Sequence, residues 1–161
     1  MNFFIQNETD KYKLSSNTEI SQIARLAADS AKLSRDFCSL NITFTDDAGI
    51  EPVNVKFLNH EGPTDVISFD YLDDYDEDLA DPEDPYVLGD LLISLETAER
   101  QAKEFGTNFN DEAILYIIHG ILHLCGYDDH EENDIREMRA AEQRTMQVVK
   151  DAMSDPRVLA K

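Results

Sequence analysis

One apolar run, residues 114 to 125, constrains the fold of this chain more than any other segment. Its length and composition predict a buried helix, and it contains two histidines, His119 and His123. At 3.6 residues per turn, positions four apart lie on one helix face, so both imidazoles point the same way. Gly126 follows and is expected to end the helix in the left-handed conformation.

Paired histidines at this spacing are typical of a single metal ion bound on a helix. They are also found as hydrogen-bonded core residues, but the acid and histidine cluster after the turn favours the metal. That cluster is Asp128, Asp129 and His130. A third ligand from it would give a three-ligand site with an open position, which is the arrangement of catalytic zinc.

The residue after the first histidine is Gly120, where zinc protease helices carry the glutamate that acts as general base. A peptidase of that class is therefore not expected. The nucleophile would be a metal-bound water, and the sequence assigns no side-chain base to it. Asp65 and Asp128 are conceivable bases or partners that orient the histidines, but neither is predicted to be catalytic.

The string HGILHLCGYD at residues 119–128 resembles the signature of the YbeY family, bacterial metal-dependent endoribonucleases that act in ribosomal RNA maturation. Residues 63–69 and the Gly-Asp pair at 89–90 extend the resemblance, which follows the order of elements over nearly the whole chain. The family's third metal ligand is a histidine ten residues after the first. That position is Asp129 here, so we expect Asp129 as the third ligand and keep His130 as the alternative.

The resemblance also implies an arginine that is absent from this chain. The family usually places it after an Asn-x-x-aromatic string, where it is thought to contact RNA or assist catalysis. Here residues 54–57 are followed by Leu58. Lys56 and His60 are the nearby residues that could substitute, although His60 follows a turn and is expected to be an exposed loop residue.

The formal net charge of −20, from 14 Lys and Arg against 34 Asp and Glu, is unusual for an RNA-binding protein. Either a small local basic patch binds the nucleic acid, or a basic partner protein contributes to RNA binding, or the substrate is not RNA. Arg136, Arg139 and Arg144 form the densest basic cluster, and Arg136 and Arg139 with Lys56 are the RNA-binding candidates. The simpler alternative is that these arginines pair with neighbouring glutamates.

The periodicity of apolar residues predicts one α+β domain over residues 1–161, with a small mixed sheet covered by helices and a central, buried metal-binding helix. Ser16 and Glu19 are typical of a capping box. The acidic segment 72–85 is expected to be a solvated loop. The expected strands are 3–9, 38–45, 64–71 and 86–94. The expected long helices are 17–33, 95–105, one that starts at Asn110, and 132–153. A short helix is expected after residues 46–47, with Pro52 in its first turn and an apolar face of Ile50, Val53 and Phe57.

The predicted function is a zinc-dependent, single-strand-specific endoribonuclease in ribosomal RNA processing and ribosome quality control, with one Zn²⁺ per chain. The alternatives are a metal-dependent hydrolase of peptides or small molecules and a non-enzymatic ribosome-assembly factor with a structural metal. Expected partners are ribosomal RNA and ribosomal or assembly proteins, with no membrane and no organic cofactor. Nothing at the N-terminus is typical of a signal peptide, so the cytoplasm, with Cys38 and Cys125 reduced, is the expected location.

Overall fold

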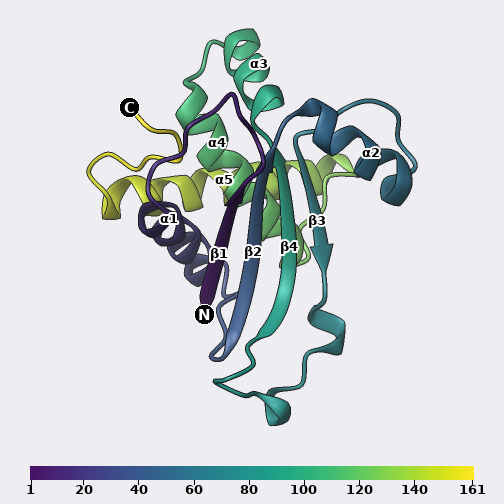
Figure 1. The fold of residues 1–161 in the computed structure, drawn as a ribbon, viewed down its shortest axis with the longest axis vertical. Helices are drawn as coiled ribbons and strands as arrows, with labels where there is room; N and C mark the ends of the chain where they lie inside the picture. The colour runs from purple at the N-terminus through teal and green to yellow at the C-terminus, as the bar shows by residue number, and fades with distance from the viewer.

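The computed structural model describes residues 1–161 and is organised around a four-stranded mixed sheet (Figure 1). The strand order is β1-β2-β4-β3, with the first three parallel and β3 antiparallel to β4. Alternation of apolar and polar residues specifies these strands, since successive side chains point to opposite faces. The strands are β1 (Asn2–Asn7), β2 (Cys38–Thr45), β3 (Val66–Asp70) and β4 (Tyr86–Ser94).

Five helices pack on this sheet or on one another, which confirms the α+β class and the small mixed sheet. The fourth helix packs against the sheet, the first helix and the last helix, so it is the central helix that the sequence predicts (Figure 1). No helix combines the length and apolar character needed to cross a bilayer. The helices are α1 (Asn17–Ser30), α2 (Asp47–Leu58), α3 (Leu95–Phe105), α4 (Phe109–Leu124) and α5 (Glu132–Ala152).

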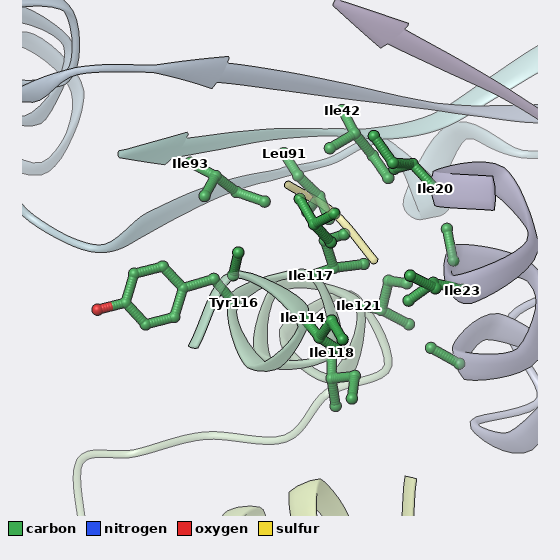
Figure 2. Packing of buried hydrophobic residues seen from close by; sticks show 14 of the residues in the cluster. Ile20, Ile23, Ile42, Leu91, Ile93, Ile114, Tyr116, Ile117, Ile118 and Ile121 are labelled. Carbon is green, nitrogen blue, oxygen red and sulfur yellow. The ribbon is translucent and has the colours of Figure 1, made fainter. Parts of the chain in front are cut away.

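The isoleucines of α4 form the centre of the hydrophobic core (Figure 2). Ile114, Ile117 and Ile121 are fully buried and lie between the sheet and α1. Burying each such side chain stabilises the fold by about 1.5–3 kcal/mol. Ile42 of β2 and Leu91 of β4 meet them from the sheet. The core therefore fixes the position of α4 and, with it, the direction in which its histidines point.

Gly120 lets α4 approach the sheet closely. A Cβ atom at this position would lie 2.9 Å from a methyl carbon of Leu91 and 3.1 Å from one of Val66, which is closer than normal packing allows. Ser68 Oγ of β3 also donates a hydrogen bond to the Gly120 carbonyl oxygen over 3.2 Å. Position 120 thus faces the sheet, and this explains physically why it carries no glutamate.

The end of α4 is a Schellman motif, as the glycine signal predicts. Gly126 has φ of +94°, its N–H donates to the His123 carbonyl, and the Tyr127 N–H donates to the Leu122 carbonyl, both over 3.1 Å. The left-handed residue reverses the chain direction immediately after the second histidine. The turn therefore carries the residues that follow back toward the exposed side of α4.

The start of α4 differs from the prediction. Asn108, not Asn110, is the N-cap, and its side chain accepts a hydrogen bond from the Asp111 N–H over 3.1 Å. Asn110 is buried, and its amide oxygen accepts from the N–H groups of Val158 and Leu159. The Asn110 amide binds the C-terminal tail because that tail folds back onto α4. Local sequence rules do not predict this long-range contact.

Other boundaries shift for similar reasons. The Ser16 cap forms, but the Glu19 side chain accepts from the Arg157 N–H rather than completing the capping box. Pro52 lies inside α2 rather than in its first turn, and Phe57, expected on the apolar face, is exposed and packs edge-on against Phe69. Strand β3 is shorter than predicted, and the acidic segment contains 3₁₀ turns at 72–74 and 77–79.

The face of the sheet turned away from α4 carries a hollow of about 830 Å³. Asp90 of the Gly-Asp pair lines it and accepts hydrogen bonds from the Asn41 amide over 2.8 Å and the Tyr71 hydroxyl over 2.9 Å. None of the histidines lines it. This hollow is therefore separate from the histidine pair.

Candidate metal centre

Solvent reaches α4 along a single stripe. From residue 111 to residue 124, every residue is buried except Asp111, Leu115, His119 and His123. These four are spaced by four residues, so they lie on one helix face, opposite the packed isoleucines. The Nε2 atoms of the two imidazoles are 2.9 Å apart. At this distance they need either one shared proton or a cation between them.

Asp129 converges on the same point. Its Oδ2 lies 3.7 Å from Nε2 of His123 and 4.0 Å from Nε2 of His119. A tetrahedral zinc with bonds of about 2.0–2.1 Å places its donor atoms roughly 3.3 Å apart, so the three donors fit one ion. The Asp129 side chain is 48% exposed, which leaves the centre accessible from solvent. Two neutral imidazoles and one carboxylate are a donor set that zinc accepts.

His130 is placed elsewhere. Its side chain is 81% exposed, and its Nε2 lies 3.3 Å from Oδ1 of Asp128. It shares no cluster within 4.8 Å with the two helix histidines, whereas Asp129 does. The structure thus brings together His119, His123 and Asp129, and it leaves the alternative third ligand on the outer side of the turn.

Glu142 of α5 is a site residue that sequence reasoning did not find. Its Oε1 lies 3.7 Å from Nδ1 of His119, and its side chain is only 14% exposed. A metal-binding histidine commonly donates the N–H of its second ring nitrogen to a carboxylate. This contact fixes the ring orientation and raises the basicity of the nitrogen that binds the metal. One signal was present: Glu142 lies four residues after the buried Met138, on the packed side of an amphipathic helix.

The two imidazoles differ in their electrostatic environment. Burial lowers the pKa of His119, but the nearby Glu142 carboxylate and the charges of Asp65 and Asp129 outweigh it, so the net pKa is raised. Burial and the charge of His119 together lower the pKa of His123 despite Asp129. Without an ion, the pair therefore holds its proton on His119.

The two candidate acids are engaged locally. Asp65 Oδ1 accepts from its neighbours, the Val66 N–H over 2.7 Å and the Thr64 hydroxyl over 3.2 Å, while its charge still acts on His119. Asp128 Oδ1 accepts from the Asp129 N–H over 2.7 Å. Neither belongs to the three-donor cluster around the histidines.

The arginines of α5 are free of ion pairs. Arg136, Arg139 and Arg144 are exposed, and none lies within 4.0 Å of a carboxylate, so the alternative that they pair with glutamates is not borne out. The reason is that their side chains extend into solvent, where such pairs gain little. Arg139 lines a groove of about 500 Å³ between α4 and α5 that also touches Glu142.

The region of the absent family arginine lies at the end of α2. Leu58 is 45% exposed, and the ammonium group of Lys56 lies over the ring of Phe57, 5.2 Å from the ring centroid. His60 is exposed, as expected of a loop residue. Nothing in this segment reproduces a guanidinium group.

Comparison with known proteins decides the family. The model of the family described as endoribonuclease YbeY matches residues 4–150. The chain belongs to this family. The YbeY endoribonuclease of Enterococcus faecalis is 38% identical over 139 residues, covering 82% of this chain and 87% of that protein. The one from Bacillus cereus is 37% identical over 134 residues, covering 82% and 85%.

The solution structure of TM1509 from Thermotoga maritima has the same fold. It superposes with a TM-score of 0.58, is 22% identical and covers 93% of this chain and 90% of its own. The predicted YbeY resemblance, the fold class and the assignment to a hydrolase family of endoribonucleases are thus confirmed. The ligand set, the metal and the RNA-binding residues stay predictions.

Proposed function

We propose that this protein is a zinc-dependent endoribonuclease that cuts single-stranded RNA during ribosomal RNA processing. The observation that carries the proposal is the convergence of three donor atoms, two imidazole nitrogens and a carboxylate oxygen, in a chain of the YbeY family. His119, His123 and Asp129 would hold the ion. The partly exposed cluster leaves room for a substrate phosphate, as a catalytic site requires.

The protein's own residues prepare the site for phosphodiester hydrolysis. Bound zinc supplies Lewis acidity, lowering the pKa of a water toward ~7 and neutralising charge that develops on the phosphate. Glu142 orients the His119 ring through Nδ1, so that Nε2 faces His123 and Asp129. Position 120 points into the sheet, and no side chain of this chain is assigned as the base.

The proposed substrate is ribosomal RNA, met together with ribosomal or assembly proteins in the cytoplasm. The resemblance to the family supports this setting. The exposed and unpaired Arg136 and Arg139, close to the groove that reaches Glu142, are the proposed RNA contacts. Lys56, two residues before the position of the absent family arginine, is a third candidate.

A second candidate is a ribosome-assembly factor that binds a structural metal without cutting RNA. Leu58 in place of the family arginine is the observation that favours it. The three-donor cluster argues against it, because structural zinc sites are normally closed by four protein ligands.

Metal analysis combined with RNA cleavage tests the proposal. The protein, purified without chelators, should carry about one zinc per chain and cut a single-stranded RNA but not its duplex. His123→Ala should lose both properties, while Lys103→Ala, at an exposed position of α3, should keep both. Zinc that survives in His123→Ala would contradict the site. Zinc binding without any cleavage would favour the assembly factor.

A further inference from the structure

A basic groove lies at the N-terminal end of α4, opposite the histidine cluster. It has a volume of about 460 Å³, and four of the ten residues that line it are basic while none is acidic. The chain has 14 basic residues against 34 acidic ones, so this concentration runs against the overall composition. The four bases are Lys11, Lys13, Arg157 and Lys161.

The groove is built from both ends of the chain. Leu14 and Leu159 form an antiparallel bridge, and the Ala160 N–H donates to the Lys13 carbonyl oxygen over 2.9 Å. The buried Asn110 amide holds the backbone of the same tail. These contacts bring lysines 148 positions apart, Lys13 and Lys161, to the rim of one groove. Its basic character therefore depends on the folded tail.

Lys13 carries a free charge of the groove, and the two ion pairs of its other lysines lie at exposed sites where such pairs are weak. Lys13 is exposed and has no carboxylate within 4.0 Å, and Lys11 is 3.6 Å from the carboxylate of Glu99, a weak contact at an exposed site. Lys161 pairs with the exposed Asp155 over 2.8 Å. The first turn of α4, which also lines the groove at Phe109, adds the positive end of the helix dipole.

A stripe of α5 connects this groove to the histidine cluster. Between residues 136 and 150, five exposed residues on α5 lie within an arc of roughly 80° at 100° per residue, and none of them is acidic; Glu132, in the first turn of α5, is the one exposed acid in the same arc. At one end of the stripe, Lys150 pairs with Asp111 in the first turn of α4 over 2.7 Å. Farther along, Arg139 lines the groove that touches Glu142. The five are Arg136, Arg139, Gln143, Gln147 and Lys150.

We propose that the basic groove binds the phosphodiester backbone of the single-stranded RNA whose scissile phosphate lies at the histidines; this rests on the proposed function. Asn110 precedes His119 and His123 by nine and thirteen residues. At 1.5 Å per residue, the groove lies about 14–20 Å from the cluster. At ~3.4 Å per stacked nucleotide, that span takes roughly four to six nucleotides.

RNA suits this groove better than an acidic protein segment. The basic residues of the groove continue as a stripe of cationic and amide side chains toward the site where the phosphodiester bond would be cut. Such stripes typically follow a nucleic-acid backbone. An acidic protein segment could bind in the groove alone, and its binding would not require the stripe that leads to the histidines. The competing occupant is the acidic segment 70–84 of a second copy of this chain, which carries nine acids and no base.

The test is the salt dependence of binding to a twelve-nucleotide single-stranded RNA that carries a fluorophore. Each phosphate contact contributes about 0.7 to the slope of log affinity against log salt concentration. Lys13→Gln should lower the slope by about 0.7, and Lys13→Gln/Lys161→Gln by about 1.4. At fixed salt, each substitution should weaken binding roughly two- to five-fold. Lys32→Gln is the matched control, since it removes one exposed charge two residues beyond the C-terminal end of α1.

RNA length gives a second readout. A tetranucleotide spans about 14 Å and barely reaches from the histidines to the groove, so the wild type should gain affinity between four and twelve nucleotides. The double variant should lose part of this gain. An unchanged slope, or an equal loss in Lys32→Gln, would overturn the proposal. Wild-type dimers that the double variant abolishes, with RNA binding unchanged, would assign the groove to the acidic segment instead.

These outcomes are independent of cleavage. If the wild type binds RNA with the expected slopes but cuts none, the proposed endoribonuclease function fails while the groove stands. If it cuts RNA and the slopes do not change, the groove proposal fails while the function stands. Thermal unfolding of the variants shows whether the tail still docks, because Lys13 contributes its backbone carbonyl, not its side chain, to that contact.

Discussion

The two ends of α4 differ in charge. At the C-terminal end, Asp129 and Glu142 surround the two histidines with negative charge. At the N-terminal end, Lys13 and Lys161 rim a groove that no acid lines. A helix about 24 Å long separates them. The net charge of −20 is therefore an average over segregated regions, and it does not exclude a surface for RNA phosphates.

The orientation of the helix agrees with this division. The partial charge of a helix is positive at its N-terminus and negative at its C-terminus, so α4 favours an anion at one end and a cation at the other. The proposed phosphate groove and the proposed metal centre occupy those ends in that order. One buried helix thus positions both parts of the proposed RNA-cutting surface.

The largest effect is expected at the metal end from Asp129→Ala. Removing the third donor leaves only two imidazoles, which should abolish stoichiometric zinc binding and lower the cleavage rate by at least about 10²-fold. Metal content and single-turnover cleavage measure the two effects. His130→Ala changes the next residue of the same turn and should retain zinc. The opposite pattern would make His130 the third ligand and contradict the geometry of the cluster.

Glu142→Gln should have the next largest effect. The amide keeps the size of the side chain but loses the charge that faces Nδ1 of His119. Loss of such a carboxylate partner typically weakens metal binding by about 10- to 100-fold. A competition titration with a zinc chelator measures this, and Gln143→Glu, which adds a carboxylate one residue away on the exposed side of α5, serves as the control. Unchanged zinc affinity in Glu142→Gln would remove Glu142 from the centre.

How much of this could be predicted from sequence depends on how local the signal is. The bounds 38–45 and 86–94 match β2 and β4 because alternation along a strand is a local pattern. The same holds for the i, i+4 histidines and for Gly126. Glu142 and the Asn110 contacts depend on helices and a tail that approach from far along the chain, and no local pattern specifies that approach.

Metal affinity should also depend on pH in a direction set by His119. Burial lowers its pKa, but Glu142 and the neighbouring acids outweigh that effect and place it above the ordinary value of 6.5. A proton on Nε2 competes with the metal, so affinity should fall by about tenfold per pH unit below the raised pKa and level off above it. His123, whose pKa is lowered, stays neutral over that range. In Glu142→Gln the break should move to lower pH, and a break that does not move would contradict the assigned cause.

The smallest effect is expected midway between the two ends, from Arg139→Gln. This residue lies on the stripe of α5 and lines the groove beside Glu142, so its loss should lower the salt slope of RNA binding by about 0.7 and weaken binding roughly two- to five-fold. Arg144→Gln is a close control, since Arg144 is equally exposed but points about 140° away around the same helix. Equal losses of RNA affinity in the two variants would mean that RNA binding depends on the total charge of α5. The stripe of α5 would then not be a defined RNA path between the groove and the histidines.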